Sequence, residues 1–279
     1  MPATHVLISS FDLAQAVEQG KPPVLLDVRW TLGDAHGIER YYRGHIPGAV
    51  YVDLDSELAG PPSLERGRHP LPDIAHLQQA ARRWGISDGD AVVAYDASGG
   101  LAAARAWWLL RWAGLTDVRL LDGGLQAWTA GGHDVAAGPG EHPHPGNVSL
   151  SAGHLPTVDT DDVARFPSHG VLLDARASER FRGEEEPVDR RAGHVPGAIS
   201  APTTENLRED GSFRPPDQLA ARFERLGVTG GDVAVYCGSG VHAAHEIAAL
   251  AIVGIDAALY PGSWSQWSAD ARRPVATGS

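Results

Sequence analysis

The feature that most limits how this chain can fold is an internal duplication. Residues 24–29 read Val-Leu-Leu-Asp-Val-Arg, and residues 171–176 read Val-Leu-Leu-Asp-Ala-Arg. The motif Gly-His-Ile-Pro-Gly-Ala at 44–49 returns as Gly-His-Val-Pro-Gly-Ala at 193–198. The copies are separated by 147 residues at the first pattern and by 149 at the second. Such a long period, with the order of motifs kept, predicts two copies of one domain rather than a solenoid of short repeats.

The repeat continues beyond these motifs. Val-Val-Ala-Tyr-Asp at 92–96 corresponds to Val-Ala-Val-Tyr-Cys at 233–237. Further on, Asp-Gly-Gly at 122–124 corresponds to Pro-Gly-Ser at 261–263, and a tryptophan follows both. The chain has 279 residues, which is enough for two domains of ordinary size.

A segment rich in proline and glycine at 138–149 is typical of a linker. We interpret its two histidines, His142 and His144, as exposed linker residues rather than metal ligands. The expected organisation is an N-terminal domain at 1–138, a linker at 139–153 and a C-terminal domain at 154–279.

Each half alternates short apolar runs with longer amphipathic stretches. Runs that suit buried parallel strands lie at 24–28, 91–95, 171–174 and 233–236. The stretches 101–112 and 241–253 have helical spacing, and Gly114 and Gly254 follow them as expected C-terminal caps. This alternation predicts an α/β fold with a central parallel sheet in each half. Ligands of such sheets bind beyond the carboxyl ends of the strands.

Composition excludes several classes of protein. The net charge of −12 argues against non-specific nucleic-acid binding, which needs a basic face. No apolar run reaches the roughly 18 residues of a membrane span, and the N-terminus lacks the pattern of a secretory signal. We therefore expect a cytoplasmic protein that does not bind membranes. The single cysteine, Cys237, excludes an intramolecular disulfide and any multi-cysteine metal site.

Cys237 is the strongest candidate for a catalytic residue. It follows the apolar run 233–236, and Gly238-Ser239-Gly240 and then a predicted helix from Val241 follow it. The two glycines allow the backbone to curl, and a curled loop at a helix start points several N–H groups inward. Such a loop binds anions and favours a cysteine thiolate. We interpret Cys237 as a reactive thiolate rather than an inert buried cysteine.

The N-terminal half has Asp96 at the matching position. A carboxylate cannot act as a sulfur nucleophile. We therefore expect one active and one inactive copy, with the N-terminal copy serving as structure or as a wall of the site.

These motifs together resemble the two-domain rhodanese-type sulfurtransferases, and the resemblance covers nearly the whole chain. It rests on Cys-Gly-Ser-Gly-Val at 237–241, on both Gly-His-(Ile/Val)-Pro-Gly-Ala motifs, on 121–128 and on Gly-Ser-Trp at 262–264. It implies two tandem rhodanese-like domains, each with a central parallel sheet flanked by helices. It also implies an active site at their interface and chemistry without a metal or an organic cofactor.

The resemblance implies a role for several residues. Cys237 matches the sulfur-accepting nucleophile, and Ser239 matches a loop serine that assists proton transfer in the 3-mercaptopyruvate enzymes. Asp55 and His69 resemble an aspartate and a histidine that reach the site from the N-terminal domain. Asp55 is alternatively a helix cap and His69 a loop residue. Arg180 matches an arginine that holds the substrate carboxylate, as its forked guanidinium suits; alternatively it pairs with surface acids such as Glu184. The remaining residues expected to line the substrate site are Gly238, Gly240, Val241 and His242.

The sequence departs from the family pattern twice. His242 stands where the family usually has threonine, and we expect it to titrate near neutrality and to tune the thiolate. The second carboxylate-binding arginine has no clean equivalent, although Arg190 and Arg191 lie in the right region. The order His242, His245, Glu246 matches neither of the zinc-protease patterns, so no metal site is predicted.

Three other functions fit the sequence less well than sulfur transfer does. A cysteine phosphatase needs an arginine six residues after the cysteine, where this chain has Ala243. No papain-like or caspase-like signature surrounds Cys237, which argues against a cysteine hydrolase. A non-catalytic binding module is less favoured because the second copy keeps its cysteine.

The sequence thus predicts a sulfurtransferase that acts through a Cys237 persulfide. The donor is expected to be 3-mercaptopyruvate, because no basic residue follows Cys237 in its loop. The alternative is a thiosulfate:cyanide sulfurtransferase, since the second arginine is displaced. The expected acceptors are a thiol, cyanide or a reduced thioredoxin-like protein.

Overall fold

The computed structural model describes residues 6–140 and 143–279 and contains two parallel sheets, one in each half of the chain. The first has the order β1-β5-β4-β2-β3 and the second β7-β6-β8-β9. The strands are β1 (Leu7–Ile8), β2 (Val24–Asp27), β3 (Val50–Tyr51), β4 (Val92–Tyr95), β5 (Val118–Leu121), β6 (Gly170–Asp174), β7 (Ile199–Ser200), β8 (Asp232–Tyr236) and β9 (Ala258–Leu259).

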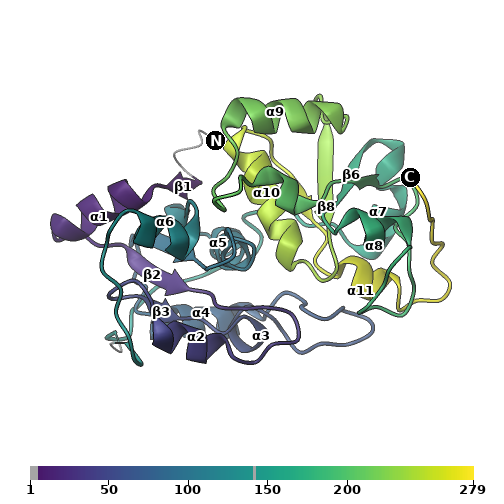
Figure 1. The fold of residues 1–279 in the computed structure, drawn as a ribbon. Coiled ribbons are helices and arrows are strands. Elements are labelled where there is room, and N and C mark those ends of the chain that lie inside the picture. The colour runs from purple at the N-terminus through teal and green to yellow at the C-terminus, as the bar shows by residue number, and fades with distance from the viewer. Residues whose placement is uncertain (1–5, 141–142) are drawn as a thin grey trace.

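Helices flank both sheets (Figure 1). In the N-terminal half they are α1 (Ser10–Glu18), α2 (Gly37–Arg43), α3 (Leu54–Glu57), α4 (Ile74–Arg83), α5 (Ala103–Trp112) and α6 (Gly124–Ala130). In the C-terminal half they are α7 (Thr160–Arg165), α8 (Ser178–Arg182), α9 (Pro216–Arg225), α10 (Val241–Ile252) and α11 (Ser263–Trp267), with short 3-10 turns η2 (Phe166–Ser168) and η3 (Thr203–Asn206). The predicted α/β fold with a parallel sheet in each half is confirmed.

The predicted strands and helices agree with the observed ones to within one or two residues. The largest shift is at α5, which begins at Ala103 rather than 101, because the backbone N–H groups of Ala102 and Ala103 bind the Asp96 side chain. Gly114 and Gly254 follow the ends of α5 and α10 with φ of 102° and 79°, a conformation that glycine adopts without strain.

The repeated motifs have the same structural task in both halves. Asp27 pairs with Arg29 at 2.6 Å, and Asp174 pairs with Arg176 at 2.6 Å. Each arginine also donates, at 2.7 Å, to the carbonyl of the glycine that begins the Gly-His-x-Pro-Gly-Ala motif. These buried ion pairs hold the Gly-His-x-Pro-Gly-Ala segment, which precedes β3 in one half and β7 in the other, against the sheet. These repeats therefore stabilise the fold.

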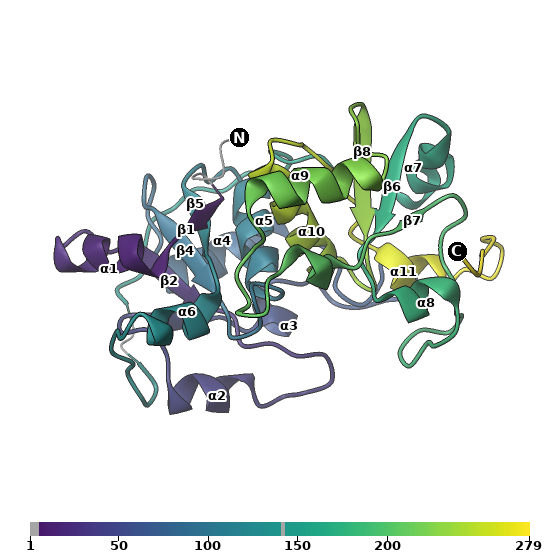
Figure 2. The same cartoon turned by 45° about the horizontal axis from the view of Figure 1, so that its top comes forward.

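The two halves share one hydrophobic core. Figures 1 and 2 show α5 and α10 side by side in the middle of the molecule, where they pack against each other. Trp107 and Trp108 of α5 and Leu250 of α10 belong to the same buried cluster. Both helices follow the loop that carries the Asp96 or Cys237 position. Their contact therefore brings the two loops face to face.

A buried polar cluster links the halves beside this core. His245 of α10 lies 2.7 Å from the Thr203 hydroxyl through Nδ1 and 3.1 Å from the Gly99 carbonyl oxygen through Nε2. Because a carbonyl only accepts, Nε2 carries the proton and Nδ1 accepts from Thr203. Glu246 pairs with Arg222 at 2.8 Å. His245 and Glu246, two of the three side chains that suggested a metal site, thus have partners within the protein. Residues 6–140 and 143–279 hold no cluster of three or more potential metal ligands.

The segment between the halves runs without helix or strand from 143 to 155. Val148 is buried and its N–H donates to the Ile86 carbonyl of the N-terminal half. His144 is exposed, and His142 lies outside the described residues. The domain boundaries themselves stay a prediction. None of the helices in the described part of the chain has the length and apolar character needed to cross a bilayer.

Acid should destabilise the protein through His245. Burial lowers the pKa of His245 from 6.5 to about 3, so the folded protein keeps it neutral while the unfolded chain takes up a proton below pH 6.5. Its contribution is complete above pH 6.5 and declines by about 2 kcal/mol by pH 5. Urea unfolding of the wild type and of His245→Gln at pH 7 and pH 5 measures this difference. The variant should lose less stability between the two pH values, and equal losses would contradict the prediction.

Candidate active site

Cys237 lies directly after β8, at the carboxyl edge of the second sheet. Its side chain is almost completely buried, and the Gly240 N–H donates to its sulfur at 3.1 Å. Gly240 has φ of 82°, and a side chain there would come within 2.8 Å of the Pro261 carbonyl oxygen. The loop can therefore curl around the sulfur only with glycine at this position. Helix α10 begins at the next residue, Val241.

The first residues of α11 support this loop through hydrogen bonds to its backbone. The Cys237 N–H donates to the Ser263 hydroxyl at 3.2 Å, and the Cys237 and Gly238 carbonyls accept from Trp264 and Ser265, both at 2.9 Å. Ser263 has φ of 52°, the only positive value of a non-glycine residue in the described ranges. Local strain of this kind is kept only where the surroundings enforce it, here where Ser263 fixes the cysteine backbone.

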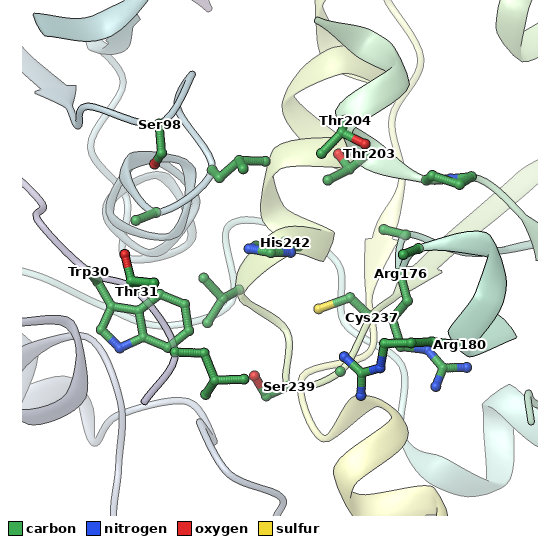
Figure 3. Close-up of a pocket in the computed structure, with 18 of the residues that line it drawn as sticks. Trp30, Thr31, Ser98, Arg176, Arg180, Thr203, Thr204, Cys237, Ser239 and His242 are labelled. Carbon is green, nitrogen blue, oxygen red and sulfur yellow. The ribbon is translucent and has the colours of Figure 1, made fainter. Parts of the chain in front are cut away.

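The cysteine faces a cavity of about 400 Å³ between the two halves. Figure 3 shows its sulfur directed towards the open space, with His242 and Ser239 on either side. The N-terminal half contributes Trp30, Thr31, Leu32, Arg68, Ser98, Leu101 and Ala102. The C-terminal half contributes, among others, Arg176, Arg180, Thr203, Gly238, Ser239, Val241 and His242. Gly240 lies behind the sulfur and does not line the cavity.

Three predicted residues form a hydrogen-bonded chain across the interface. His69 Nδ1 lies 2.7 Å from Ser239 Oγ, and His69 Nε2 lies 3.0 Å from Asp55 Oδ1. A carboxylate only accepts, so Nε2 carries the proton and Nδ1 accepts from the serine hydroxyl. Trp30 Nε1 also donates to Asp55 Oδ1 at 2.9 Å and fixes that exposed carboxylate. Burial, followed by the nearby charge of Arg105, lowers the pKa of His69 to about 4, so the imidazole is neutral at pH 7.

Asp55 is not a helix cap. The N-cap of α3 is Asp53, whose side chain accepts from the Ser56 N–H at 2.8 Å. Arg180 pairs with Glu186 at 2.6 Å and Asp189 at 3.1 Å rather than with Glu184, which binds Arg182.

His242 lines the cavity, but its charge differs from the expectation. Burial and the neighbouring Arg180 guanidinium both lower the pKa of His242, so this ring is less easily protonated than a free histidine. This direction argues against tuning of the thiolate by a protonated imidazole, and the role of His242 stays a prediction. His242 acts as a neutral polar wall of the cavity at pH 7.

Neither arginine expected to supply a second carboxylate contact lines the cavity. Arg191 donates to the carbonyl oxygens of Trp267, Ser268, Asp270 and Arg273, which ties the C-terminal segment to the domain. Arg190 lines a separate hollow on the surface.

Sequence reasoning missed Arg105, a completely buried residue of α5. Its guanidinium donates to the carbonyl oxygens of His69 at 2.9 Å, Leu58 at 3.2 Å, and Pro70 and Gly240 at 3.3 Å. No carboxylate of the described residues forms an ion pair with it. Burial lowers the pKa of Arg105 to about 10, and the negative charge of Cys237 opposes this shift. The available signal was an arginine in the first turn of a helix whose other residues, apart from Arg111 near its end, are apolar.

The loop around Asp96, in the half without a cysteine, shows how such a loop binds an anion. The Asp96 carboxylate accepts from the backbone N–H groups of Ser98, Gly100, Ala102 and Ala103 at 2.7 to 3.0 Å. These contacts fill the loop with the protein's own negative charge. The corresponding loop around Cys237 keeps its opening towards the cavity.

Comparison with known proteins agrees with this arrangement. The Rhodanese-like domain family matches residues 11–131 and again 159–270. The chain belongs to the rhodanese family. The predicted two-domain rhodanese-type architecture is thereby confirmed.

Relatives extend over the full chain. A putative thiosulfate sulfurtransferase of Mycobacterium tuberculosis is 47% identical over 99% of this chain and 98% of its own length. A probable 3-mercaptopyruvate sulfurtransferase of Pseudomonas aeruginosa is 46% identical over 94% of this chain and 95% of its own. Among solved structures, the 3-mercaptopyruvate sulfurtransferase of Escherichia coli superposes with a TM-score of 0.80 at 31% identity, covering 92% of this chain and 98% of that one.

Removing the Arg105 guanidinium should weaken both the interface and the site. Arg105→Met removes a donor from four carbonyl oxygens, of which that of Pro70 still accepts from the Gly60 N–H, and we expect this to cost about 3 kcal/mol of unfolding free energy. It also removes a positive charge that interacts with the Cys237 thiolate, so alkylation of Cys237 should require a higher pH. Urea unfolding and the pH dependence of iodoacetamide labelling measure the two effects. Arg43→Met, an exposed arginine in α2, is the control; a wild-type result for Arg105→Met would contradict the prediction.

Proposed function

We propose that this rhodanese-family protein is a sulfurtransferase that takes a sulfur atom from 3-mercaptopyruvate and holds it on Cys237 as a persulfide. The observation that carries the proposal is the chain Asp55–His69–Ser239 beside the cavity that contains the sole cysteine. After 3-mercaptopyruvate has given up its sulfur, the remainder leaves as an enolate that must be protonated. The three hydrogen-bonded side chains form a relay that can supply this proton.

The first half-reaction balances within these groups. The Cys237 thiolate attacks the thiol sulfur of 3-mercaptopyruvate, forming an S–S bond and breaking the C–S bond. The electron pair of the C–S bond leaves as the enolate of pyruvate. The proton of the substrate thiol is lost and one proton is gained at the methyl carbon, so no external acid is consumed.

Ser239 and His69 are suited to move that proton. Ser239 lines the cavity and donates to neutral His69, which can accept a proton while Asp55 stabilises the resulting cation. The proton that His69 accepts is the one lost by the substrate thiol and passed on through Ser239. Protonated His69 then returns a proton through Ser239 to the enolate, which leaves the relay in its starting state.

The persulfide needs stabilisation as an anion. Gly240 N–H already donates to the Cys237 sulfur, and the Asp96 loop gives an internal example of several N–H groups around one anion. In the second half-reaction an acceptor thiolate, or cyanide, attacks the outer sulfur and the Cys237 thiolate leaves. A thiol, cyanide and a thioredoxin-like protein are the proposed acceptors. We expect the reaction in the cytoplasm, where thiols are kept reduced.

Thiosulfate is the second candidate donor. Arg68 and Arg180 line the cavity, and the Mycobacterium tuberculosis relative is named for thiosulfate. Attack on thiosulfate expels sulfite and needs no proton, so this donor would not use the relay. The relay therefore favours 3-mercaptopyruvate.

The first test concerns the nucleophile. After incubation with 3-mercaptopyruvate and no acceptor, intact-mass analysis should show the gain of one sulfur atom. Cys237→Ser should show no gain and no turnover with either donor, because the chain has no other cysteine. Turnover by this variant would contradict the mechanism. A wild-type protein that takes sulfur from neither donor would favour the binding-module alternative.

The second test separates the two donors. Ser239→Ala removes the general acid, so kcat with 3-mercaptopyruvate should fall roughly a hundredfold or more. With thiosulfate the same variant should stay within a few-fold of the wild type, which makes that reaction the internal control. His69→Gln should give the same split. Equal losses with both donors would mean that Ser239 shapes the loop and does not transfer a proton.

A further inference from the structure

His242 presents an imidazole without a hydrogen-bond partner to the active-site cavity. It is the second residue of α10, and it lines the cavity that contains Cys237. Figure 3 shows its ring on one side of the cysteine sulfur and Ser239 on the other. Neither ring nitrogen of His242 has a hydrogen-bond partner within the described part of the chain. Both nitrogens are therefore available to a molecule in the cavity.

Two other histidines close to the active loop differ from His242 because their nitrogens are already bound. His69 contacts Ser239 through Nδ1 and Asp55 through Nε2. Both nitrogens of His245, one turn further along α10, also have partners within the protein. These contacts hold the relay and the interface together, whereas no such structural contact explains the ring of His242.

The ring of His242 is neutral at pH 7 and can take up a proton. Burial, followed by the Arg180 guanidinium of α8, lowers the pKa of His242 from 6.5, and the Asp96 carboxylate of the N-terminal half opposes this shift. His245, on the same helix, is neutral as well. A neutral imidazole is the side chain that most often serves as a general base.

Positive charge on the cavity wall favours an anionic nucleophile near Cys237. Arg68, Arg176 and Arg180 all line the cavity, although each also pairs with a carboxylate. A side chain built on Gly238, next to the nucleophile, would lie 3.0 Å from Arg68 Nη2. Nearby positive charge stabilises the ionised form of a thiol. An acceptor thiol in this cavity is thus easier to ionise than in water, provided that a base takes its proton.

We propose that His242 is the general base for the acceptor thiol, on the side of the Cys237 sulfur opposite to the relay. The relay reaches the cavity only through the Ser239 hydroxyl, which is bound to His69, whereas the nitrogens of His242 open onto the cavity directly. The role rests on the persulfide of the proposed function, but it does not depend on which donor supplies the sulfur.

The step balances with the groups in the cavity. The acceptor thiol gives its proton to a His242 nitrogen, and the resulting thiolate attacks the outer sulfur of the Cys237 persulfide. An S–S bond forms to the acceptor while the bond between the two persulfide sulfurs breaks, and its electron pair stays on Cys237 as the thiolate. Protonated His242 then gives its proton to the departing persulfide of the acceptor. No oxidant or reductant is consumed.

The test starts from a persulfide made without the proposed donor. Inorganic polysulfide transfers a terminal sulfur to the Cys237 thiolate and leaves as a polysulfide shorter by one atom. After the reagent has been removed, an acceptor is added, and the loss of one sulfur from the intact mass gives the discharge rate. Cys237 is the only cysteine, so the mass reports this residue directly.

Two acceptors separate proton removal from sulfur transfer. At pH 8 the thiol of 2-mercaptoethanol is mostly protonated, whereas sulfite carries no proton on the sulfur that attacks. His242→Gln should slow discharge by 2-mercaptoethanol roughly tenfold or more and leave discharge by sulfite within a few-fold of the wild type. The deficit with the thiol should shrink at about pH 9.5, where the thiol ionises without a base. A residue that only shapes the cavity would not give this pH dependence.

Matched variants make the result decisive. His242→Thr should give the same split as His242→Gln, and His144→Gln, at an exposed histidine that does not line the cavity, should behave as the wild type. Ser239→Ala should lose much less of the thiol rate than His242→Gln does.

Three results overturn the proposal: no loss in His242→Gln, equal losses with thiol and sulfite, or a larger thiol loss in Ser239→Ala, which would assign the acceptor proton to the relay. A loss confined to the thiol, in a protein that polysulfide loads and 3-mercaptopyruvate does not, would keep His242 as the base and reject the proposed donor.

Discussion

The interaction on which the site depends is the burial of Arg105 between the two halves. Its guanidinium ties the carbonyl oxygens of 58, 69 and 70 to that of Gly240, in the loop that surrounds Cys237. A buried cation without a carboxylate partner is costly, and the negative charge of Cys237 offsets part of that cost. Thiolate and persulfide carry the same charge, so Arg105 keeps its counter-charge in both states of the proposed cycle. The halves must be in contact for the site to exist.

Duplication produced two loops at corresponding positions, one closed around its own carboxylate and one open to a cavity. In the first, the Asp96 carboxylate occupies the N–H groups of its own loop and makes that loop rigid. In the second, the loop around Cys237 opens onto the cavity. The first loop still contributes, because the Gly99 carbonyl accepts from buried His245 of α10 and helps to hold the halves together. The half without the cysteine thus helps to hold the half that carries it in place.

The groups around Cys237 come from segments that are distant in the chain. The relay histidine and Arg68 come from one N-terminal loop and Arg180 from α8. Ser263, at the start of α11, supports the cysteine backbone. The Asp–Arg pairs of the repeated motifs hold each sheet together, and Arg176 also lines the cavity. The other groups proposed to react or to bind stand at positions whose side chains differ between the copies.

The sequence by itself determined the duplication, the two parallel sheets and the position of Cys237 at a strand end. Its resemblance to the rhodanese-type sulfurtransferases supplied the candidates Ser239, His69, Asp55 and Arg180. Strand and helix periodicity and a loop with glycines on both sides are local properties, so they can be recognised along the chain. Only the tertiary structure decided that Arg68 stands beside Gly238, that Arg105 bridges the halves, that Arg191 is structural, and that His242 is less easily protonated than expected. These facts depend on which groups face each other across a buried interface. Desolvation and the geometry of distant donors and acceptors set them, and neither leaves a local pattern in the sequence.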